Sequence, residues 1–238
     1  MLSAEQKLQV RESKVSKFNF DLIADRYDRW YASSRGAMYD RLEKKLIAYI
    51  LPSAGEGQRA LEVGCGTGHW SEYFSNRGFE VTGVDISKEM IEVAKNKHIA
   101  KSQFQVADGE NLPFADESFD LAVAVTTLEF TANPEKMVSE MARCVKKPAG
   151  KLIVGVLNAL CSYNQKRKNK SHGVYSAANL LSPEQIKELL ERFGKPQILI
   201  AGFVPQRSWL LWLSPLCEFA GHLISSQRGV FIAAKVDL

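Results

Sequence analysis

The sequence predicts an α/β fold with a seven-stranded, mostly parallel sheet and helices on both of its faces. From about residue 59 onward, short runs of strand-forming residues alternate with helical patterns, which is typical of βαβ units. The run at Leu121–Val125 is apolar at every position, as expected of a central strand covered on both faces. A glycine-rich turn also follows the first of these runs, where open α/β sheets bind ligands.

The first half of this alternating region has clear local signals. Arg59–Val63 is the first expected strand, and a helix is expected over 67–77, with Gly78 as its C-terminal stop. The second strand is expected at 80–84. Ser87 then caps a helix whose first turn contains an acid and whose apolar positions recur at helical spacing.

The second half begins with a short third strand at 104–106, followed by the apolar fourth strand. Asn133 and Pro134 supply a helix cap and a proline at the first helical position, so a helix is expected from there to about Cys144. Ser182 and Pro183 repeat this signal for a later helix that Gly194 ends. The remaining strands are expected at Lys151–Leu157, 197–202 and 229–234.

We interpret residues 1–238 as one domain. Residues 1–55 would form an N-terminal helical cap, 56–158 the ligand-binding core, and 159–238 the substrate-side segments and final strands. The composition, with 45% hydrophobic and 24% charged residues, is typical of a globular enzyme.

The charge does not favour a nucleic-acid-binding protein. The net charge is only +4, whereas such proteins usually carry a clustered basic face. The densest basic run lies at 166–170, and we interpret it as a solvated loop, with contact to an anionic substrate as the alternative.

Cysteines, histidines and apolar stretches predict neither a metal site nor a secreted or membrane-spanning protein. The four cysteines form no CxxC pair, and the four histidines lack metal-ligand spacing. The N-terminus has no secretion signal. The most apolar stretch, 209–224, is shorter than the roughly 20 residues that a spanning helix needs. We therefore expect a cytoplasmic protein with free thiols and no stable membrane insertion.

The glycine-rich turn and one acid together predict a nucleoside site. Gly64, Gly66 and Gly68 lie where a strand ends and a helix begins, so the backbone can turn sharply and approach a ligand. Asp85 ends the second strand and could accept both hydroxyls of a ribose. His69 stands where dinucleotide folds have a further glycine, and 58 residues precede the first strand. Both features favour a methyl-donor site over a nicotinamide site.

Four segments in order, ALEVGCGTG, GVDIS, VADGENLPFADESFD and VTTLEF, resemble the motifs of class I S-adenosylmethionine-dependent methyltransferases. The closest resemblance is to the ubiquinone/menaquinone-biosynthesis-like group of small-molecule enzymes, and it covers about residues 18–158. It implies a Rossmann-like fold with an antiparallel final strand, S-adenosyl-L-methionine as cofactor and a small-molecule acceptor. The oligomeric state is left open between a monomer and a homodimer.

The same resemblance implies roles for individual residues. Around the methionine and ribose parts, the loop would comprise Gly64, Cys65, Gly66 and Gly68, while Glu62 would orient the amino group and Asp85 would hold the ribose hydroxyls. Around the adenine, Ile86 would pack with Met90 nearby, and Asp108 would accept from the exocyclic amine, flanked by Gly109 and Glu110. Thr126 would meet the methionine end, and Tyr27, or alternatively Tyr31, would close the site.

Other interpretations of these residues stay open. Ile86 and Met90 could be core residues, Asp108 could form a turn beside its glycine, and Tyr27 and Trp30 could only pack against the sheet. Tyr27, Glu129 and His172 are candidate general bases, but none is assigned, so the catalytic residues are unknown.

The acceptor pocket is expected to come from the N-terminal cap, 158–181 and 203–228. The aromatic and aliphatic residues of the last segment are interpreted mainly as core and lid packing, with an apolar substrate pocket or a membrane or dimer contact as alternatives. The alternative functions are a cofactor-binding regulatory protein without turnover and, less favoured, a nicotinamide-dependent oxidoreductase.

Overall fold

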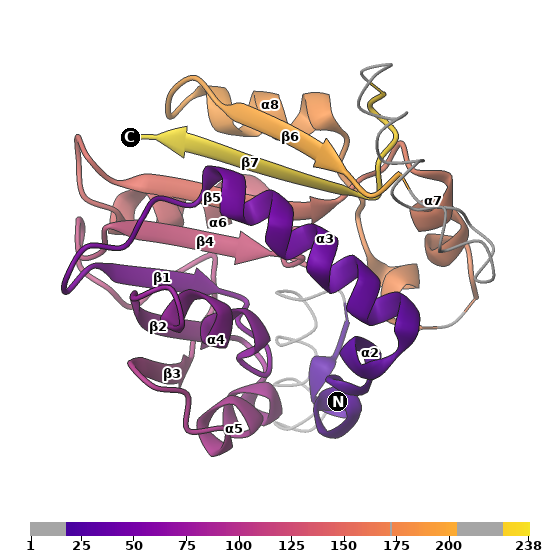
Figure 1. Cartoon of the computed structure of the whole chain (residues 1–238), viewed down its shortest axis with the longest axis horizontal. Helices are drawn as coiled ribbons and strands as arrows, with labels where there is room; N and C mark the ends of the chain where they lie inside the picture. Colours follow the sequence, from indigo (N-terminus) through magenta and orange to yellow (C-terminus); the bar gives the residue numbers. More distant parts are fainter. Residues whose placement is uncertain (1–17, 172, 204–225) are drawn as a thin grey trace, which may run out of the picture.

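The computed structural model describes residues 18–171, 173–203 and 226–238. Its centre is a seven-stranded sheet in the order β3-β2-β1-β4-β5-β7-β6 (Figure 1). All neighbouring pairs from β3 to β5 are parallel, and β7 runs antiparallel to both β5 and β6. The predicted mostly parallel sheet with an antiparallel final strand is therefore confirmed. The strands are β1 (Arg59–Val63), β2 (Glu80–Asp85), β3 (Ser102–Val106), β4 (Leu121–Val125), β5 (Lys151–Leu157), β6 (Gln197–Ala201) and β7 (Phe231–Asp237).

Three predicted helix starts are confirmed by their cap hydrogen bonds. The side chain of Ser87 accepts from Met90 N, and that of Asn133 accepts from Lys136 N. Ser182 forms a capping box with Gln185. The helices after the first strand are α4 (His69–Ser75), α5 (Lys88–Asn96), α6 (Pro134–Cys144), α7 (Ser162–Lys168) and α8 (Pro183–Glu191), with a 3-10 helix η2 (Val174–Ala177) between the last two.

Several local predictions were wrong, among them the last strand, which was expected at 229–234 and spans Phe231–Asp237. The helix expected over 67–77 begins only at His69, because Gly68 still has a left-handed backbone (φ +80°) that continues the turn after β1. The basic run expected to be a solvated loop instead begins within helix α7, and Arg167 on this helix lies against aromatic rings. Helical pattern and loop pattern are hard to distinguish in such a short polar segment.

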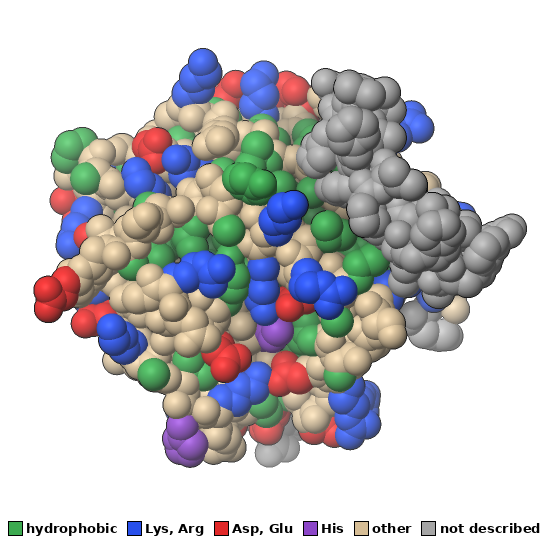
Figure 2. All heavy atoms as spheres, viewed as in Figure 1, with side chains coloured by type: hydrophobic (Ala, Val, Ile, Leu, Met, Phe, Trp, Pro, Cys, Tyr) green, Lys and Arg blue, Asp and Glu red, His purple; other side chains and the backbone are tan. Residues whose placement is uncertain are grey.

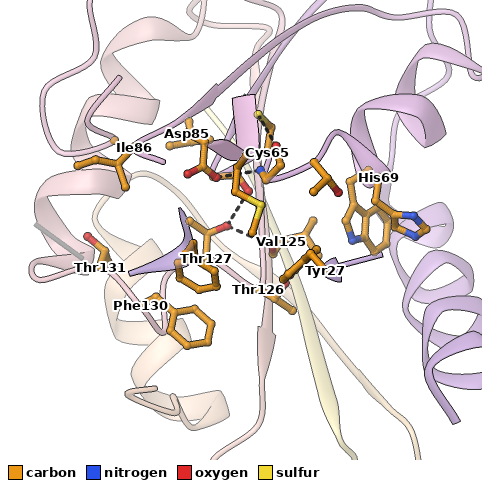
Figure 3. A pocket seen from close by; sticks show the side chains of 18 of the residues that line it. Tyr27, Cys65, His69, Asp85, Ile86, Val125, Thr126, Thr127, Phe130 and Thr131 are labelled. Carbon is orange, nitrogen blue, oxygen red and sulfur yellow. Dashed lines mark hydrogen bonds between the residues drawn. The ribbon is translucent and has the colours of Figure 1, made fainter. Parts of the chain in front are cut away.

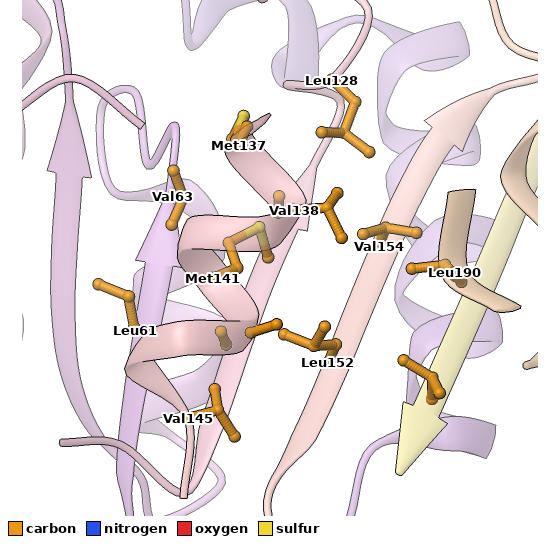
Figure 4. Close-up of a cluster of buried hydrophobic side chains, with 14 of the residues drawn as sticks. Leu61, Val63, Leu128, Met137, Val138, Met141, Val145, Leu152, Val154 and Leu190 are labelled. Carbon is orange, nitrogen blue, oxygen red and sulfur yellow. The ribbon is translucent and has the colours of Figure 1, made fainter. Parts of the chain in front are cut away.

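Helices cover both faces of the sheet, as predicted. On one face, Met137 and Met141 of α6 and Leu190 of α8 pack against residues of the central strands such as Leu152 and Val154 (Figure 4). On the other face, α3 and α4 contribute a second buried cluster that includes Ile47, Trp70 and Phe74. Burial of this apolar surface on both sides is the main stabilising contribution to the fold.

The N-terminal segment forms three elements, of which the two short ones come first. These are η1 (Phe20–Arg26), α2 (Arg29–Ala32) and α3 (Ser34–Ile50). Helix α3 crosses the sheet and packs against β5, β6 and β7, while η1 packs against α5 (Figure 1). The N-terminal segment is thus brought beside the loops that follow β1 and β2.

The described residues include no helix long and apolar enough to cross a membrane, and no cluster of histidine, cysteine and acidic side chains that could hold a metal ion. The apolar stretch 209–224 lies outside the described residues. On the face shown in Figure 2, basic and acidic side chains are interspersed and do not gather into one basic surface.

Candidate functional site

A cavity opens at the C-terminal ends of β1, β2 and β4, under η1 and α2 (Figure 3). This is the edge of the sheet where open α/β folds bind their ligands. We name it the first cavity. Most residues predicted for the site line it: Tyr27, Gly64, Cys65, Gly66, Asp85, Ile86, Met90, Asp108, Gly109 and Thr126.

The glycine turn forms one wall of the first cavity. The backbone N–H groups of Gly64 and Cys65 donate to Val84 O at 2.7 and 2.9 Å, so the turn is held against β2. A Cβ on Gly64, whose φ is +74°, would lie 2.1 Å from Thr127 Cγ2. A Cβ on Gly66, whose φ is +52°, would meet no atom within 4 Å. Packing against Thr127 therefore requires glycine at position 64. The backbone of Gly66, by contrast, borders open space.

Asp85 connects this turn to the end of β2. Its Oδ2 accepts from Gly66 N at 2.8 Å (Figure 3), and its Oδ1 accepts from Ser87 N at 2.9 Å. A carboxylate has about four acceptor positions, so each oxygen can accept a further hydrogen bond from a ligand hydroxyl. Burial raises the pKa of Asp85, whereas the N–H groups of Ser87 and Gly66 act in the opposite direction. The turn and the acid therefore face the same space.

Two residues predicted for the adenine end occupy different environments. The side chain of Ile86 is 36% exposed at the edge of the cavity, whereas Met90 is 1% exposed and belongs to the core as well as to the cavity wall. Asp108 Oδ1 accepts from Glu110 N at 2.8 Å, so this residue shapes a turn and also lines the cavity. Within the part of the chain that the structure describes, its Oδ2 accepts no hydrogen bond, so it is available for a ligand.

Three residues predicted for the site do not line the first cavity. Glu62 lies buried in β1, accepts from Ser71 Oγ at 2.5 Å, and has its pKa raised by burial to about 8. Gly68 precedes α4. Glu110 accepts from Thr131 Oγ1 at 2.8 Å, and Thr131 itself lines the cavity. Glu62 and Glu110 thus do not border the cavity themselves but bond through their side chains to neighbouring residues. Gly68 contributes only its backbone, at the start of α4.

The prediction missed cavity residues that come together only through the fold. Phe20 of η1 packs edge-on against Phe130, with ring centroids 5.1 Å apart, and both line the cavity. Tyr31, the predicted alternative to Tyr27, stacks at 3.7 Å on His69, which was not predicted for the site. His69 Nε2 lies 2.7 Å from Asp40 Oδ1 of α3. No local sequence signal marks these pairs. Thr127, Phe130 and Thr131 follow closely after β4, and this position could have identified these three residues. The other residues that line the cavity are Val63, Thr67, Trp70, Ala107, Val125 and Met137.

A second cavity of about 300 Å³ adjoins the first. The two cavities share the wall residues Phe20, Tyr27, Tyr31, Thr126 and Phe130. The rest of the second wall comes from α3, α7, η2 and neighbouring residues: Ile23, Arg26, Trp30, Tyr39, Glu43, Leu157, Arg167, Val174, Tyr175 and Val230. Segments of the cap and of 158–181 thus form this cavity, whereas 204–225 of the predicted 203–228 segment lie outside the described residues.

Thr126 lies at the junction of the two cavities in an uncommon backbone conformation. Its φ is +51°, a left-handed value that a β-branched residue rarely adopts, and its N–H donates to Gly155 O at 2.7 Å. Such conformations persist only where the surrounding structure holds them, and they often occur at functional sites.

The three candidate bases differ in position. Tyr27 lines both cavities, and burial raises its pKa, so its phenol is neutral near pH 7. Glu129 is fully buried, its Oε1 accepts from Leu157 N at 2.5 Å, and it lines neither cavity. Burial raises the pKa of Glu129 to about 7. His172 lies outside the described residues.

Comparison with known proteins places residues 61–154 in a family described as a methyltransferase domain. The chain is 35% identical over 178 residues to an uncharacterized protein of Methanocaldococcus jannaschii, covering 74% of this chain and 80% of that protein. It is 35% identical over 135 residues to the demethylmenaquinone methyltransferase of Renibacterium salmoninarum, covering 57% of this chain and 55% of that enzyme. The structure of a SAM-dependent methyltransferase from Thermotoga maritima superposes with a TM-score of 0.70 at 25% identity, covering 91% of this chain and 96% of that one.

Proposed function

The chain belongs to the class I S-adenosylmethionine-dependent methyltransferases, and from this premise we propose that it transfers the methyl group to a small molecule bound in the second cavity. The observation that carries the proposal is the junction of the two cavities. One of them has a nucleoside-type wall, and the other is lined by aromatic residues. Thr126 and Tyr27 belong to both walls, so a donor and an acceptor could meet there.

The cofactor is S-adenosyl-L-methionine, and the first cavity has the features that this molecule requires. The open space beside Gly66 lets the cofactor approach the backbone of the turn, and the carboxylate of Asp85 can still accept hydrogen bonds from ribose hydroxyls. Ile86 offers an exposed apolar side chain to the adenine. We propose that Gly64, Cys65 and Thr126 face the methionine end. Glu62, Gly68 and Glu110 would act indirectly, by holding the wall.

When bound, S-adenosyl-L-methionine supplies a methyl group activated by a positively charged sulfur. The protein's own contribution would be to align the acceptor in the second cavity and to exclude water. Alignment of two reactants in ideal cases supplies about 7–11 kcal/mol. The neutral phenol of Tyr27 could donate a hydrogen bond there but does not act as a base at neutral pH. No general base is assigned to this reaction.

Two finer features also belong to this proposal. We place the chain in the ubiquinone/menaquinone-biosynthesis-like group, which the order of its motifs and its similarity to a demethylmenaquinone methyltransferase support. We also treat residues 1–238 as a single domain, since strands from 59 to 237 form one sheet and the N-terminal helix α3 packs on it.

Two measurements test the proposal. Thermal shift and calorimetry with S-adenosylmethionine, S-adenosylhomocysteine and NADH should show stabilisation by the first two and none by the third. Incubation with isotope-labelled S-adenosylmethionine and a panel of small acceptors should then release S-adenosylhomocysteine. Cofactor binding without product on any acceptor would favour a regulatory protein, and binding of NADH alone would reject the methyltransferase function.

A further inference from the structure

Arg167 is an arginine held inside the second cavity by aromatic rings. Its Cζ lies 3.3 Å from the ring centroid of Tyr175, 5.2 Å from that of Trp30 and 5.3 Å from that of Tyr163. Trp30 and Tyr175 line the same cavity. A guanidinium stacked in this way is fixed in position and direction, unlike a side chain that extends into solvent.

One end of this guanidinium lacks a partner. Nη2 of Arg167 is buried and has no hydrogen-bond partner among the residues that the structure describes. Buried charged donors are normally satisfied, because an unpaired one loses its hydration without compensation. Arg167 lines the cavity wall, so a ligand in the cavity would lie beside its guanidinium.

The remaining ionisable groups of the wall leave the cavity positively charged near pH 7. Glu43 lines the cavity but forms no salt bridge with Arg167 within the described ranges. Burial raises the pKa of Glu43 to about 8 although the charge of Arg167 acts to lower it, so Glu43 is mostly neutral. Burial also raises the pKa of the tyrosines on this wall, which are therefore neutral. Arg26 adds a second guanidinium.

An aromatic wall could instead bind a cationic amine, but here this role is already filled. The face of Tyr175, with Trp30 beside it, contacts the guanidinium of Arg167. A ligand cation would have to displace that guanidinium or lie beside it, and like charges repel. The structure therefore favours a methyl acceptor that carries a negative charge.

We propose that the methyl acceptor carries an anionic oxygen group, a carboxylate or a phosphate, that binds the guanidinium of Arg167, while a flat apolar part of the acceptor packs against the aromatic wall. This inference rests on the proposed function, because it assumes that the second cavity holds the acceptor. The anionic group anchors the molecule at α7 and η2. Its apolar part extends toward Thr126 and Tyr27, where the two cavities meet.

The test uses the whole chain saturated with S-adenosylhomocysteine and matched probes. Calorimetry compares 4-hydroxybenzoate with its neutral amide, 4-hydroxybenzamide, with phenyl phosphate and with the cation tyramine. We expect at least one of the two anions to bind at least tenfold more tightly than the amide. A stronger response to phenyl phosphate than to 4-hydroxybenzoate would identify phosphate as the preferred group, and the reverse order would identify carboxylate.

Arg167→Gln should abolish this preference for anions, whereas Lys170→Gln, which removes the same charge from an exposed position nearby, should keep it. Arg167→Lys, which keeps the charge but not the stacked guanidinium, should retain part of it. Affinity for S-adenosylhomocysteine should be unchanged in all three variants, which shows that they are folded.

Equal binding of acid and amide, tighter binding of tyramine, or no binding of either anion at millimolar concentration would overturn the inference. Loss of the preference in Lys170→Gln would do so too. A wild-type chain that fails to bind S-adenosylhomocysteine would instead contradict the proposed function itself.

Discussion

Replacing Asp85 with asparagine tests the nucleoside site most sharply. The carboxylate accepts from Gly66 N and Ser87 N and has one further acceptor position on each oxygen. An asparagine keeps the shape but replaces one acceptor oxygen with an NH₂ group and removes the charge. The variant should therefore lose at least one charge-assisted hydrogen bond to a ribose hydroxyl.

The expected magnitude follows from typical hydrogen-bond energies. Hydrogen bonds to charged groups contribute about 1.5–3 kcal/mol each. A loss of about 2–3 kcal/mol in binding corresponds to a roughly 30- to 150-fold higher Kd for S-adenosylhomocysteine. The substitution also leaves one backbone N–H without its acceptor oxygen. This loss should lower the free energy of unfolding by about 1–3 kcal/mol.

Calorimetry with S-adenosylhomocysteine measures the first effect, and urea unfolding measures the second. The matched control is Asp120→Asn. Asp120 accepts from Arg59 N at 2.9 Å and from Lys146 Nζ at 2.7 Å directly before β4, at the opposite end of the strands from the first cavity. This control should reduce stability but leave cofactor affinity unchanged. Wild-type affinity in a folded Asp85→Asn variant would refute the role of this carboxylate.

Three further predictions concern the stability of the site and its support. Gly64→Ala should lower the free energy of unfolding in urea by more than about 2 kcal/mol, because its Cβ would clash with Thr127. Gly57→Ala, with a similar φ of +69° and open space around it, should lose only about 1–2 kcal/mol. Equal losses in the two variants would contradict the packing argument. Burial raises the pKa of Glu129 from 4.5 to about 7, so its contribution to stability is complete below pH 4.5 and is lost as the pH rises to about 7. Glu129→Gln should flatten this part of a Tm-against-pH curve, and an unaltered slope would count against the shift. Arg143 donates to two backbone carbonyls and two carboxylates around the loop before β4. Arg143→Gln should therefore lower the free energy of unfolding by about 1–3 kcal/mol without weakening S-adenosylhomocysteine binding. A loss of affinity would show that this loop also shapes the site.

Features encoded within a few neighbouring residues were predictable from the sequence. The caps at Ser87, Asn133 and Ser182 depend on a side chain and a backbone N–H three residues away, and the structure has all three. The alternation of strand and helix patterns likewise predicted the sheet. The proximity of Gly66 and Asp85 followed from βαβ geometry, because the ends of adjacent parallel strands meet at one edge of the sheet.

Contacts between distant segments were not predictable in this way. Phe20 and Phe130 are more than a hundred residues apart, and only the packing of η1 over the strand ends brings their rings together. The sequence also does not distinguish a buried polar residue from an exposed one. Arg167 belongs to a basic run that suggested solvent, but its guanidinium stacks on Tyr175 inside a cavity. Burial depends on the tertiary fold, to which local polarity is a weak guide.

A crystal structure of the complex with S-adenosylhomocysteine tests the two-cavity arrangement most directly. It should show the ribose hydroxyls within hydrogen-bond distance of Asp85, the adenine against Ile86, and the sulfur directed past Thr126 toward the second cavity. A nucleoside bound elsewhere, or a sulfur that faces away from the cavity lined by Tyr27 and Arg167, would contradict it.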